Sequence, residues 1–327
     1  MPAPDPIVVR GLARSFKTRD GVVEAVKGID FTVRAGEIVG LLGPNGAGKT
    51  TTLRMLTTLL EPTAGSATVA GHDLASRPRE VRRRIGYVAQ VGAAPSAGTL
   101  LGEELVTQAR LQGLSKAAAA ARLAQLAPRL DLAGLERRAL LELSGGQRRR
   151  FDVALGLMHE PAVVFLDEPT TGLDPQSRAN LWEHIRRLRE EMGVTILLTT
   201  HYLDEADALA DRILVMDHGG LVADDTPAAL KARIAGDVIH LGFASPEHAE
   251  RAAALARETV SARELVAQGD ELSVTVDDGA VAIAPLLGAL DGAGLRPATV
   301  AVSRPTLDDV FLTLTGRSLR EDEEAAA

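Results

Sequence analysis

Residues 43–50 read GPNGAGKT and fit the pattern G-x-x-x-x-G-K-[ST], which cradles the phosphates of a nucleotide. The apolar run 37–42 precedes this segment and a helix-forming stretch follows it, so the expected context is strand, loop and helix. Its glycines let backbone N–H groups face phosphate oxygens, while Lys49 could reach the β- and γ-phosphates and Thr50 could offer a hydroxyl to Mg²⁺. A glycine turn that only caps a strand is the alternative, and the context argues against it. The expected nucleotide-binding residues here are Gly43, Pro44, Asn45, Gly46, Ala47, Gly48, Lys49, Thr50 and Thr51.

Two carboxylates end a second apolar run. Residues 163–166 read VVFL and lead directly into Asp167 and Glu168. Ligands of open α/β sheets gather at the carboxyl ends of strands, so Asp167 is a candidate Mg²⁺ ligand and Glu168 could orient or deprotonate an attacking water. Alone, this pattern could be a strand followed by a solvated turn. Beside a phosphate loop it favours nucleotide hydrolysis.

A third motif, LSGGQ at residues 143–147, precedes the predicted helix 148–159. Its serine can cap that helix, and its glycines leave backbone N–H groups free to face an anion. Alone, it could be an ordinary helix start. The candidate phosphate-facing residues are Ser144, Gly145, Gly146 and Gln147.

Hydrophobic patterning predicts an α/β chain, because apolar strands alternate with helices as in a parallel sheet covered on both faces. A long Ala/Leu/Arg-rich helical stretch, 100–135, interrupts this alternation and is typical of a separate subdomain. The expected strands are 7–10, 31–33, 37–42, 66–70, 85–88, 163–166, 194–199 and 212–216, and the other expected helices are 51–60, 176–191 and 204–210.

Composition shifts near Gly236, and the following residues predict a β-α-β-β-α-β order, typical of a small α+β domain of ferredoxin-like type. Its expected strands are 238–243, 260–267, 271–276 and 298–302, with helices 246–258 and 280–290. A helix over 305–314 and a solvated acidic tail come last. The predicted domains are 1–235, with a helical subdomain at about 95–147, then 236–304 and 305–327.

Composition narrows the possible functions. The 327 residues carry 36 Lys+Arg against 44 Asp+Glu, a net charge of −8, which argues against a nucleic-acid partner bound over a broad face. The absence of cysteine excludes disulfides, thiolate metal sites and a cysteine nucleophile. No histidine pair has metal-binding i, i+4 spacing, so Mg²⁺ is the only ion we predict. The sequence shows neither a signal segment nor a long apolar span, which predicts a cytoplasmic location.

The order of these motifs resembles that in the nucleotide-binding subunit of ATP-binding-cassette (ABC) transporters. The phosphate loop comes first and LSGGQ second, followed by the strand ending in Asp167 and Glu168, the segment PTTGLD at 169–174, and His201. The resemblance covers about residues 7–235 and implies a P-loop NTPase cassette, with a mostly parallel sheet, an antiparallel β part and a helical subdomain. It also implies that ATP is bound with Mg²⁺ and hydrolysed.

The same resemblance assigns roles to single residues. Gln90 would sense Mg²⁺, water and the membrane partner, and would contribute to the metal site. Asp174 would lie at a subunit contact, His201 would touch the γ-phosphate and Phe16 would stack on the adenine. A core position is the alternative for Phe16. Two chains would pair head to tail as a homodimer, with two ATPs held between the phosphate loop of one chain and the Ser144 region of the other.

The residues RRR at 148–150 and the segment PTLDDVFLTLTGR at 305–317 look like the daunorubicin-resistance type of exporter. That resemblance implies an ATPase that powers export of a drug, antibiotic or other amphiphilic compound through a separate integral membrane permease, at the cytoplasmic face of the plasma membrane. The arginine run could instead be a solvated helix face. Residues 91–99 depart from the pattern, because they are mostly small where the permease would be contacted. The alternatives are a soluble cassette ATPase acting on ribosomes or DNA complexes, and the ATPase of an importer.

Overall fold

The computed structural model describes residues 4–19, 21–90, 98–234, 236–303 and 306–315. The chain separates into two compact units, divided between Thr226 and Pro227. The division falls earlier than the expected boundary at 235, because helix α8 (Pro227–Ile234) packs against α11 (Leu307–Thr315) within the second unit. The acidic tail and most of residues 91–99 lie outside the described residues.

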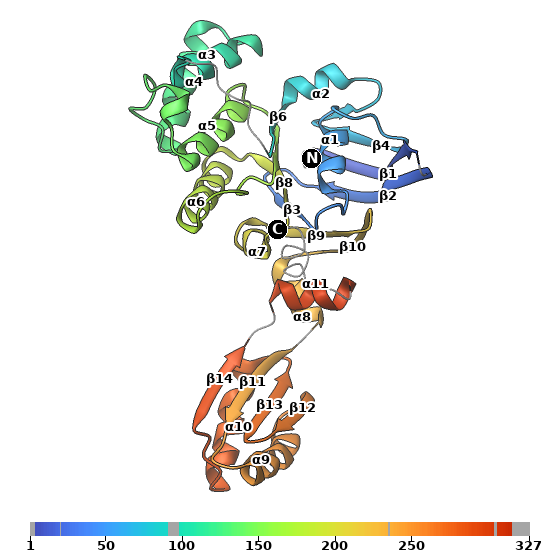
Figure 1. The fold of residues 1–327 in the computed structure, drawn as a ribbon, viewed down its shortest axis with the longest axis vertical. Helices are drawn as coiled ribbons and strands as arrows, with labels where there is room; N and C mark the ends of the chain where they lie inside the picture. The colour runs from blue at the N-terminus through green and yellow to red at the C-terminus, as the bar shows by residue number, and fades with distance from the viewer. Residues whose placement is uncertain (1–3, 20, 91–97, 235, 304–305, 316–327) are drawn as a thin grey trace. The chain divides into compact units, whose positions relative to one another are not determined.

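A six-stranded sheet forms the centre of the first unit (Figure 1), in the order β10-β9-β3-β8-β7-β6. Strands β9, β3, β8, β7 and β6 run parallel, and β10 is antiparallel to β9. Residues of β3, β7 and β8 are all buried, which explains their continuous apolar runs, because both faces of the sheet are covered. The strands span β3 Ile38–Leu42, β6 Ile85–Val88, β7 Val163–Asp167, β8 Thr195–Thr200, β9 Arg212–Asp217 and β10 Gly220–Asp225.

A four-stranded antiparallel sheet packs beside the central sheet, in the order β2-β1-β4-β5. The prediction of short strands at 7–10 and 31–33 was wrong in extent, because β1 (Ile7–Thr18) and β2 (Gly21–Val33) form one long hairpin. Several shifts of register interrupt this hairpin and disturb the two-residue alternation by which a strand is recognised. Strands β4 (Ala64–Val69) and β5 (His72–Asp73) complete the sheet.

Helix α1 (Lys49–Leu56) follows β3, and it ends earlier than the predicted limit of 60. The hydroxyl of Thr57 donates to the carbonyl oxygen of Leu53, and Thr58 has a φ of +62°, a left-handed conformation that stops the helix. The expected helical stretch 100–135 is two helices, α3 and α4. Figure 1 shows α3, α4 and α5 gathered on one side of the unit, with β1, β2 and β4 on the other. The remaining helices of this unit are α2 Pro78–Arg84, α3 Leu101–Leu111, α4 Lys116–Arg129, α5 Gly145–Leu157, α6 Pro175–Met192 and α7 Leu203–Leu209.

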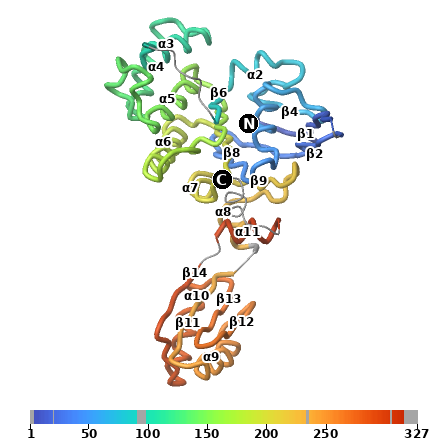
Figure 2. Tube along the Cα trace, in the orientation of Figure 1, coloured from blue at the N-terminus to red at the C-terminus, as the bar shows by residue number. Residues whose placement is uncertain are grey.

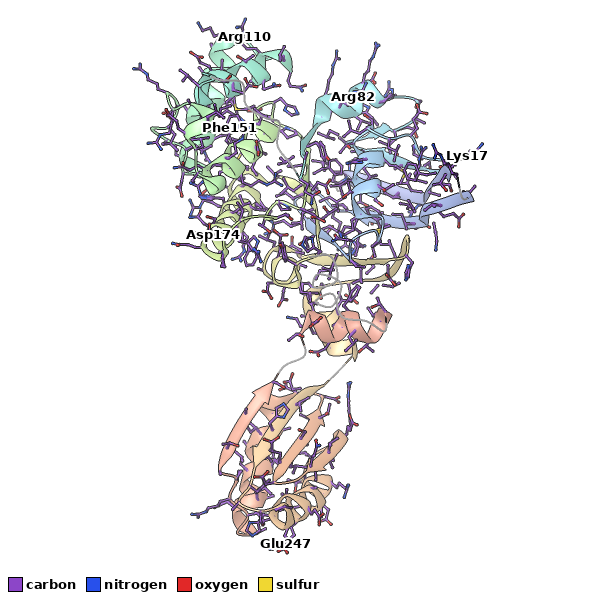
Figure 3. All side chains as sticks on the ribbon, in the orientation of Figure 1. Lys17, Arg82, Arg110, Phe151, Asp174 and Glu247 are labelled. Carbon is purple, nitrogen blue, oxygen red and sulfur yellow. The ribbon has the colours of Figure 1, made fainter. Side chains whose placement is uncertain are left out.

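Two apolar cores hold this unit together. One lies between the central sheet and the helices α3 to α6, and includes Phe151 of α5 (Figure 3). The other lies between the central sheet, α1 and the antiparallel sheet, and includes Phe165 of β7. The central sheet therefore contributes side chains to both cores, and the loops at its strand ends are held by packing from two sides.

The second unit contains an antiparallel sheet in the order β12-β13-β11-β14, with α9 and α10 packed on it (Figure 2). The order of its elements agrees with the β-α-β-β-α-β prediction, and the ferredoxin-like classification stays a prediction. The elements span β11 Asp237–Gly242, α9 Pro246–Thr259, β12 Ala262–Gln268, β13 Glu271–Val276, α10 Gly279–Gly292 and β14 Thr299–Ser303. Within the described ranges of both units, no helix is long and apolar enough to span a bilayer.

Candidate nucleotide-binding site

The phosphate loop connects the buried end of β3 to the start of α1, as its sequence predicts. A Cβ at Gly43 would collide with the carbonyl oxygen of Met216, and one at Gly48 would collide with that of Ala25. Gly48 also has a φ of +104°, which L side chains rarely adopt. The loop therefore requires glycine at both positions, and α1 begins directly after it at Lys49.

Lys49, the first residue of α1, is 4% exposed. Its Nζ donates to the carbonyl oxygens of Gly43 (2.6 Å) and Pro44 (2.9 Å), and lies 3.7 Å from Oε1 of Glu168. Burial lowers the pKa of Lys49, while the carboxylates of Glu168 and Asp167 act against this shift. A cation is thus held at the mouth of the loop, where phosphate charge would need to be balanced.

Asp167 ends β7 and lies almost fully buried, with 2% exposure. Its Oδ1 accepts hydrogen bonds from the hydroxyls of Thr50 (3.1 Å) and Thr199 (2.7 Å), and its Oδ2 accepts one from Tyr87 (3.3 Å). Hydroxyl and carboxylate oxygens are the donors that Mg²⁺ prefers, usually one or two protein groups completed by substrate phosphates. Thr50 and Asp167 therefore fit a Mg²⁺ ion bound together with a nucleotide.

Glu168 follows in a strained conformation, with a φ of +43°. Its Oε2 accepts hydrogen bonds from Nε2 of Gln90 (2.8 Å) and the hydroxyl of Thr171 (3.2 Å), and its Oε1 lies 3.3 Å from Nδ1 of His201. Burial alone would raise the pKa of Glu168, but contacts with His201, Lys49 and Thr171 bring it below its usual value. The carboxylate is therefore charged at neutral pH and able to accept a proton or a hydrogen bond.

A pocket of about 340 Å³ opens at this place. Asp167 lies next to it through its bond to Thr50, and His201 through its contact with Glu168. The pocket is lined by Ala25, Asn45, Gly46, Gly48, Lys49, Thr50, Thr51, Gln90 and Glu168. The structure thus brings the phosphate loop, both carboxylates, Gln90 and His201 together.

The LSGGQ segment does not line this pocket. Ser144 is the N-cap of α5, where its hydroxyl accepts from the N–H of Gln147 (3.3 Å) and its own N–H donates to Oε1 of Gln147 (3.0 Å). Asp174 caps α6 in a similar way and accepts from the N–H (2.9 Å) and hydroxyl (2.6 Å) of Ser177. These bonds lower the pKa of Asp174. A Cβ at Gly146 would approach the hydroxyl of Ser177, so the two helix starts are neighbours, and Figure 3 shows Asp174 at the surface.

Phe16 lies in β1, half-buried, opposite Val23 of β2. The guanidinium of Arg14 lies 4.7 Å from the centre of its ring. Phe16 is not among the residues that line the pocket, although Ala25 of the same hairpin does line it. Adenine stacking by Phe16 stays a prediction.

Sequence reasoning missed three residues of the site. Tyr87 and Thr199 bond the Asp167 carboxylate from the neighbouring strands β6 and β8, a juxtaposition that only the sheet order creates. Arg149 lies in the arginine run, for which a solvated helix face was the alternative. That alternative is wrong for this residue, because Arg149 is 7% exposed and bonds the backbone beside the site.

Comparison with known proteins agrees with this geometry. Residues 26–171 match the ABC transporter family. The chain is 42% identical over 326 residues to the doxorubicin resistance ATP-binding protein DrrA of Mycobacterium tuberculosis, covering 94% of this chain and 93% of that protein. It is 44% identical over 305 residues to the daunorubicin/doxorubicin resistance ATP-binding protein DrrA of Streptomyces peucetius, covering 92% of each chain. It is also 43% identical over 302 residues to the Nod factor export ATP-binding protein I of Burkholderia thailandensis, covering 90% of this chain and 93% of that protein.

Solved structures give the same result for the fold. The cbiO1 subunit from Clostridium perfringens, part of an ABC transporter complex, superposes with a TM-score of 0.62 at 28% identity, covering 70% of this chain and 91% of that one. An ATP-binding subunit of another ABC transporter superposes with a TM-score of 0.60 at 28% identity, covering 69% of this chain and 92% of that one. Together with the phosphate loop and the paired carboxylates, these findings show that the chain belongs to the ABC transporter family, as one of its ATP-hydrolysing subunits.

Proposed function

We propose that this chain powers the export of a drug, an antibiotic or another amphiphilic compound through a separate membrane permease. The observation that carries the catalytic part is the convergence of Lys49, Asp167, Glu168 and His201 on one pocket beside the phosphate loop. The export part is supported by similarity along nearly the whole chain to resistance and Nod factor export ATP-binding proteins. Ribosome- or DNA-directed ATPases and importers have no comparable support.

Hydrolysis would proceed by positioning and charge balance. Loop N–H groups and Lys49 would hold the β- and γ-phosphates, and Thr50, Asp167 and Gln90 would hold Mg²⁺, which would neutralise phosphate charge. Glu168 accepts a hydrogen bond or proton from the attacking water, because its carboxylate is charged and buried within reach of the pocket. His201, whose Nδ1 lies 3.3 Å from Oε1 of Glu168, would touch the γ-phosphate.

The active unit is a head-to-tail homodimer with two ATPs at its interface. Within one chain, the N-terminus of α5 does not line the pocket, and its exposed Ser144 and neighbouring glycines face no phosphate loop of their own. In a two-fold dimer, each chain supplies this helix start to the nucleotide of the other, and Asp174, which caps the adjacent α6, lies at the contact.

Mixing two variants of low activity tests this arrangement. Lys49→Ala breaks the phosphate loop, and Ser144→Ala breaks the contact made in the partner. A mixed dimer holds one site in which both parts are intact, so mixing should restore up to about a quarter of the wild-type ATPase rate. A mixture no more active than the separate variants would contradict the head-to-tail arrangement.

The permease contacts a groove beside β6. The groove is lined by Leu59 after α1, Arg82 of α2 (Figure 3), Tyr87 of β6 and residues of α3 and α5. The hydroxyl of Tyr87 donates to Asp167, so an occupant of this groove would be one side chain away from the proposed metal ligand. The bond between Tyr87 and Asp167 thus links the proposed permease groove to the hydrolysis site. The chain would work at the cytoplasmic face of the membrane.

Co-purification tests whether the partner of this chain is a membrane permease. The tagged chain, gently extracted from its source cells, should bring down a polytopic membrane protein that lacks a cassette of its own. Leu59→Asp should weaken that association, because Leu59 is an apolar groove residue with 60% exposure. Val22→Asp, at 64% exposure outside the groove, is the control. Recovery of ribosomal or DNA-repair proteins in place of a permease would overturn the export function.

A further inference from the structure

Arg149 connects helix α5 to the backbone of the hydrolysis site. Although it lies between two other arginines, its side chain is buried, and each hydrogen bond that its guanidinium donates to a described residue goes to a backbone carbonyl oxygen. These oxygens belong to Pro169 (2.5 Å), Ala89 (2.7 Å), Asp167 (3.1 Å), Glu168 (3.2 Å) and Gln90 (3.4 Å).

Those carbonyls belong to the two segments that carry the side chains around the attacking water. One segment ends in Gln90, and the other contains Glu168, whose φ of +43° is unfavourable for a residue with a side chain. Such a conformation is strained and persists only when the surroundings hold it. Arg149 bonds the carbonyls of Glu168 and of the residues before and after it, so it holds the strained residue from both sides.

The chemistry of arginine suits this task. Its planar guanidinium presents five N–H donors in a fixed fork, which can satisfy carbonyls arriving from several directions. A lysine ammonium at the end of a flexible stem cannot fix the same geometry. Burial lowers the pKa of Arg149, and the acidic side chains of Asp152, Glu205 and Asp167 act against this shift.

We propose that Arg149 is a positioning residue for ATP hydrolysis, which holds the Glu168 carboxylate against the Gln90 amide in the geometry that the attacking water requires. The inference rests on the hydrolytic roles proposed above for Gln90 and Glu168. Arg149 acts through the backbone of these residues and does not touch the nucleotide.

Arg122 provides a matched control within the same unit. It is 6% exposed, its guanidinium donates to the carbonyl oxygen of Leu157 (3.0 Å from Nη2), and burial lowers its pKa as it does for Arg149. It lies in α4, and its hydrogen bonds go to Leu157 and Gln125, neither of which lines the pocket. Substitution of either arginine should therefore destabilise the fold, whereas only Arg149 should affect hydrolysis.

The experiment measures kcat, the KM for ATP and the urea midpoint of full-length Arg149→Gln, Arg149→Lys, Arg122→Gln and Glu168→Gln, at a temperature where each is folded. Arg149→Gln should lower kcat about 10- to 100-fold, because displacing a catalytic group by about 1 Å lowers the rate by up to about this factor. The KM for ATP should change less than about threefold. Arg149→Lys should recover only part of that loss. Arg122→Gln should lower the urea midpoint and keep kcat within about twofold of wild type.

A wild-type kcat in folded Arg149→Gln, combined with an inactive Glu168→Gln, would overturn the inference and leave the proposed site intact. An active Glu168→Gln would instead overturn the site itself. If both Arg149 variants failed to fold while Arg122→Gln folded, the role of Arg149 would be structural, and the proposal would fall.

Discussion

Ser144 has two separable roles, one in helix capping and one in the proposed dimer, and the substitution Ser144→Ala distinguishes them. Its hydroxyl accepts a hydrogen bond from the N–H of Gln147 at 3.3 Å, while the reciprocal bond to Oε1 of Gln147 survives in the variant. Loss of an N-cap hydroxyl costs about 1 kcal/mol. Ser115 caps α4 in the same way, accepting from Ala118 at 3.1 Å, so Ser115→Ala should cost about the same.

The two variants should differ in ATP hydrolysis. In the proposed head-to-tail dimer, Ser144 would bond the phosphate of the nucleotide held by the partner, and a hydrogen bond to a charged group contributes about 1.5–3 kcal/mol. At about 1.4 kcal/mol for each factor of ten, Ser144→Ala should lower the hydrolysis rate about 10- to 100-fold. Ser115→Ala should stay within about twofold of wild type, because α4 carries no residue of the pocket.

Trp182 makes the stability measurement specific. It is the only tryptophan of the chain and lies in α6, so its fluorescence during urea unfolding reports on the first unit alone. The ATPase rate is measured by phosphate release from the same preparations. If both variants lost stability equally and also hydrolysed ATP equally, Ser144 would be a cap and nothing more, and the in-trans contact would be refuted.

Three further predictions concern charged residues of the first unit. Glu168→Gln should retain ATP binding and lower turnover about 100- to 10,000-fold, as expected for a general base, and normal phosphate release from it would rule out that role. Lys49→Ala should lose both binding and turnover, so an undiminished affinity in a nucleotide titration would count against the phosphate loop. Burial raises the pKa of Glu205 although Nε1 of Trp182 donates a hydrogen bond to its Oε1 (3.1 Å), so the folded state binds its proton more tightly and loses stability as pH rises above about 4.5. Glu205→Gln should therefore gain stability relative to wild type as the pH of urea unfolding is raised above about 4.5, and a difference that does not change with pH would contradict the raised pKa of Glu205.

The chemistry of the site could be predicted from sequence because its motifs act locally. The loop 43–50 needs glycines where the backbone approaches Met216 and Ala25, and a lysine at the start of a helix. The residue types at these positions therefore indicate the mechanism directly. The same holds for a strand that ends in two carboxylates, and for a serine three residues before a glutamine at a helix start. The alternating order of strands and helices could also be predicted from sequence, since buried parallel strands are continuous apolar runs.

The full length of the β1–β2 hairpin could not be predicted from sequence, because its register shifts interrupt the alternation of exposed and buried residues. The second unit shows the opposite case. Its order of elements could be predicted from regular patterns in strands and helices, but the order of strands in its sheet could not.

The sequence by itself predicted which residues would bind phosphate and which carboxylates could serve the metal and the water, and it determined in what order the elements follow. Only the tertiary structure decided that Tyr87 and Thr199 bond Asp167, that Ser144 lies apart from the loop of its own chain, and that Arg149 turns inward. The physical reason is the range of the interactions. A turn or a cap depends on neighbours a few residues away, whereas a buried guanidinium depends on carbonyls brought to it by strands about 20 and 60 residues distant.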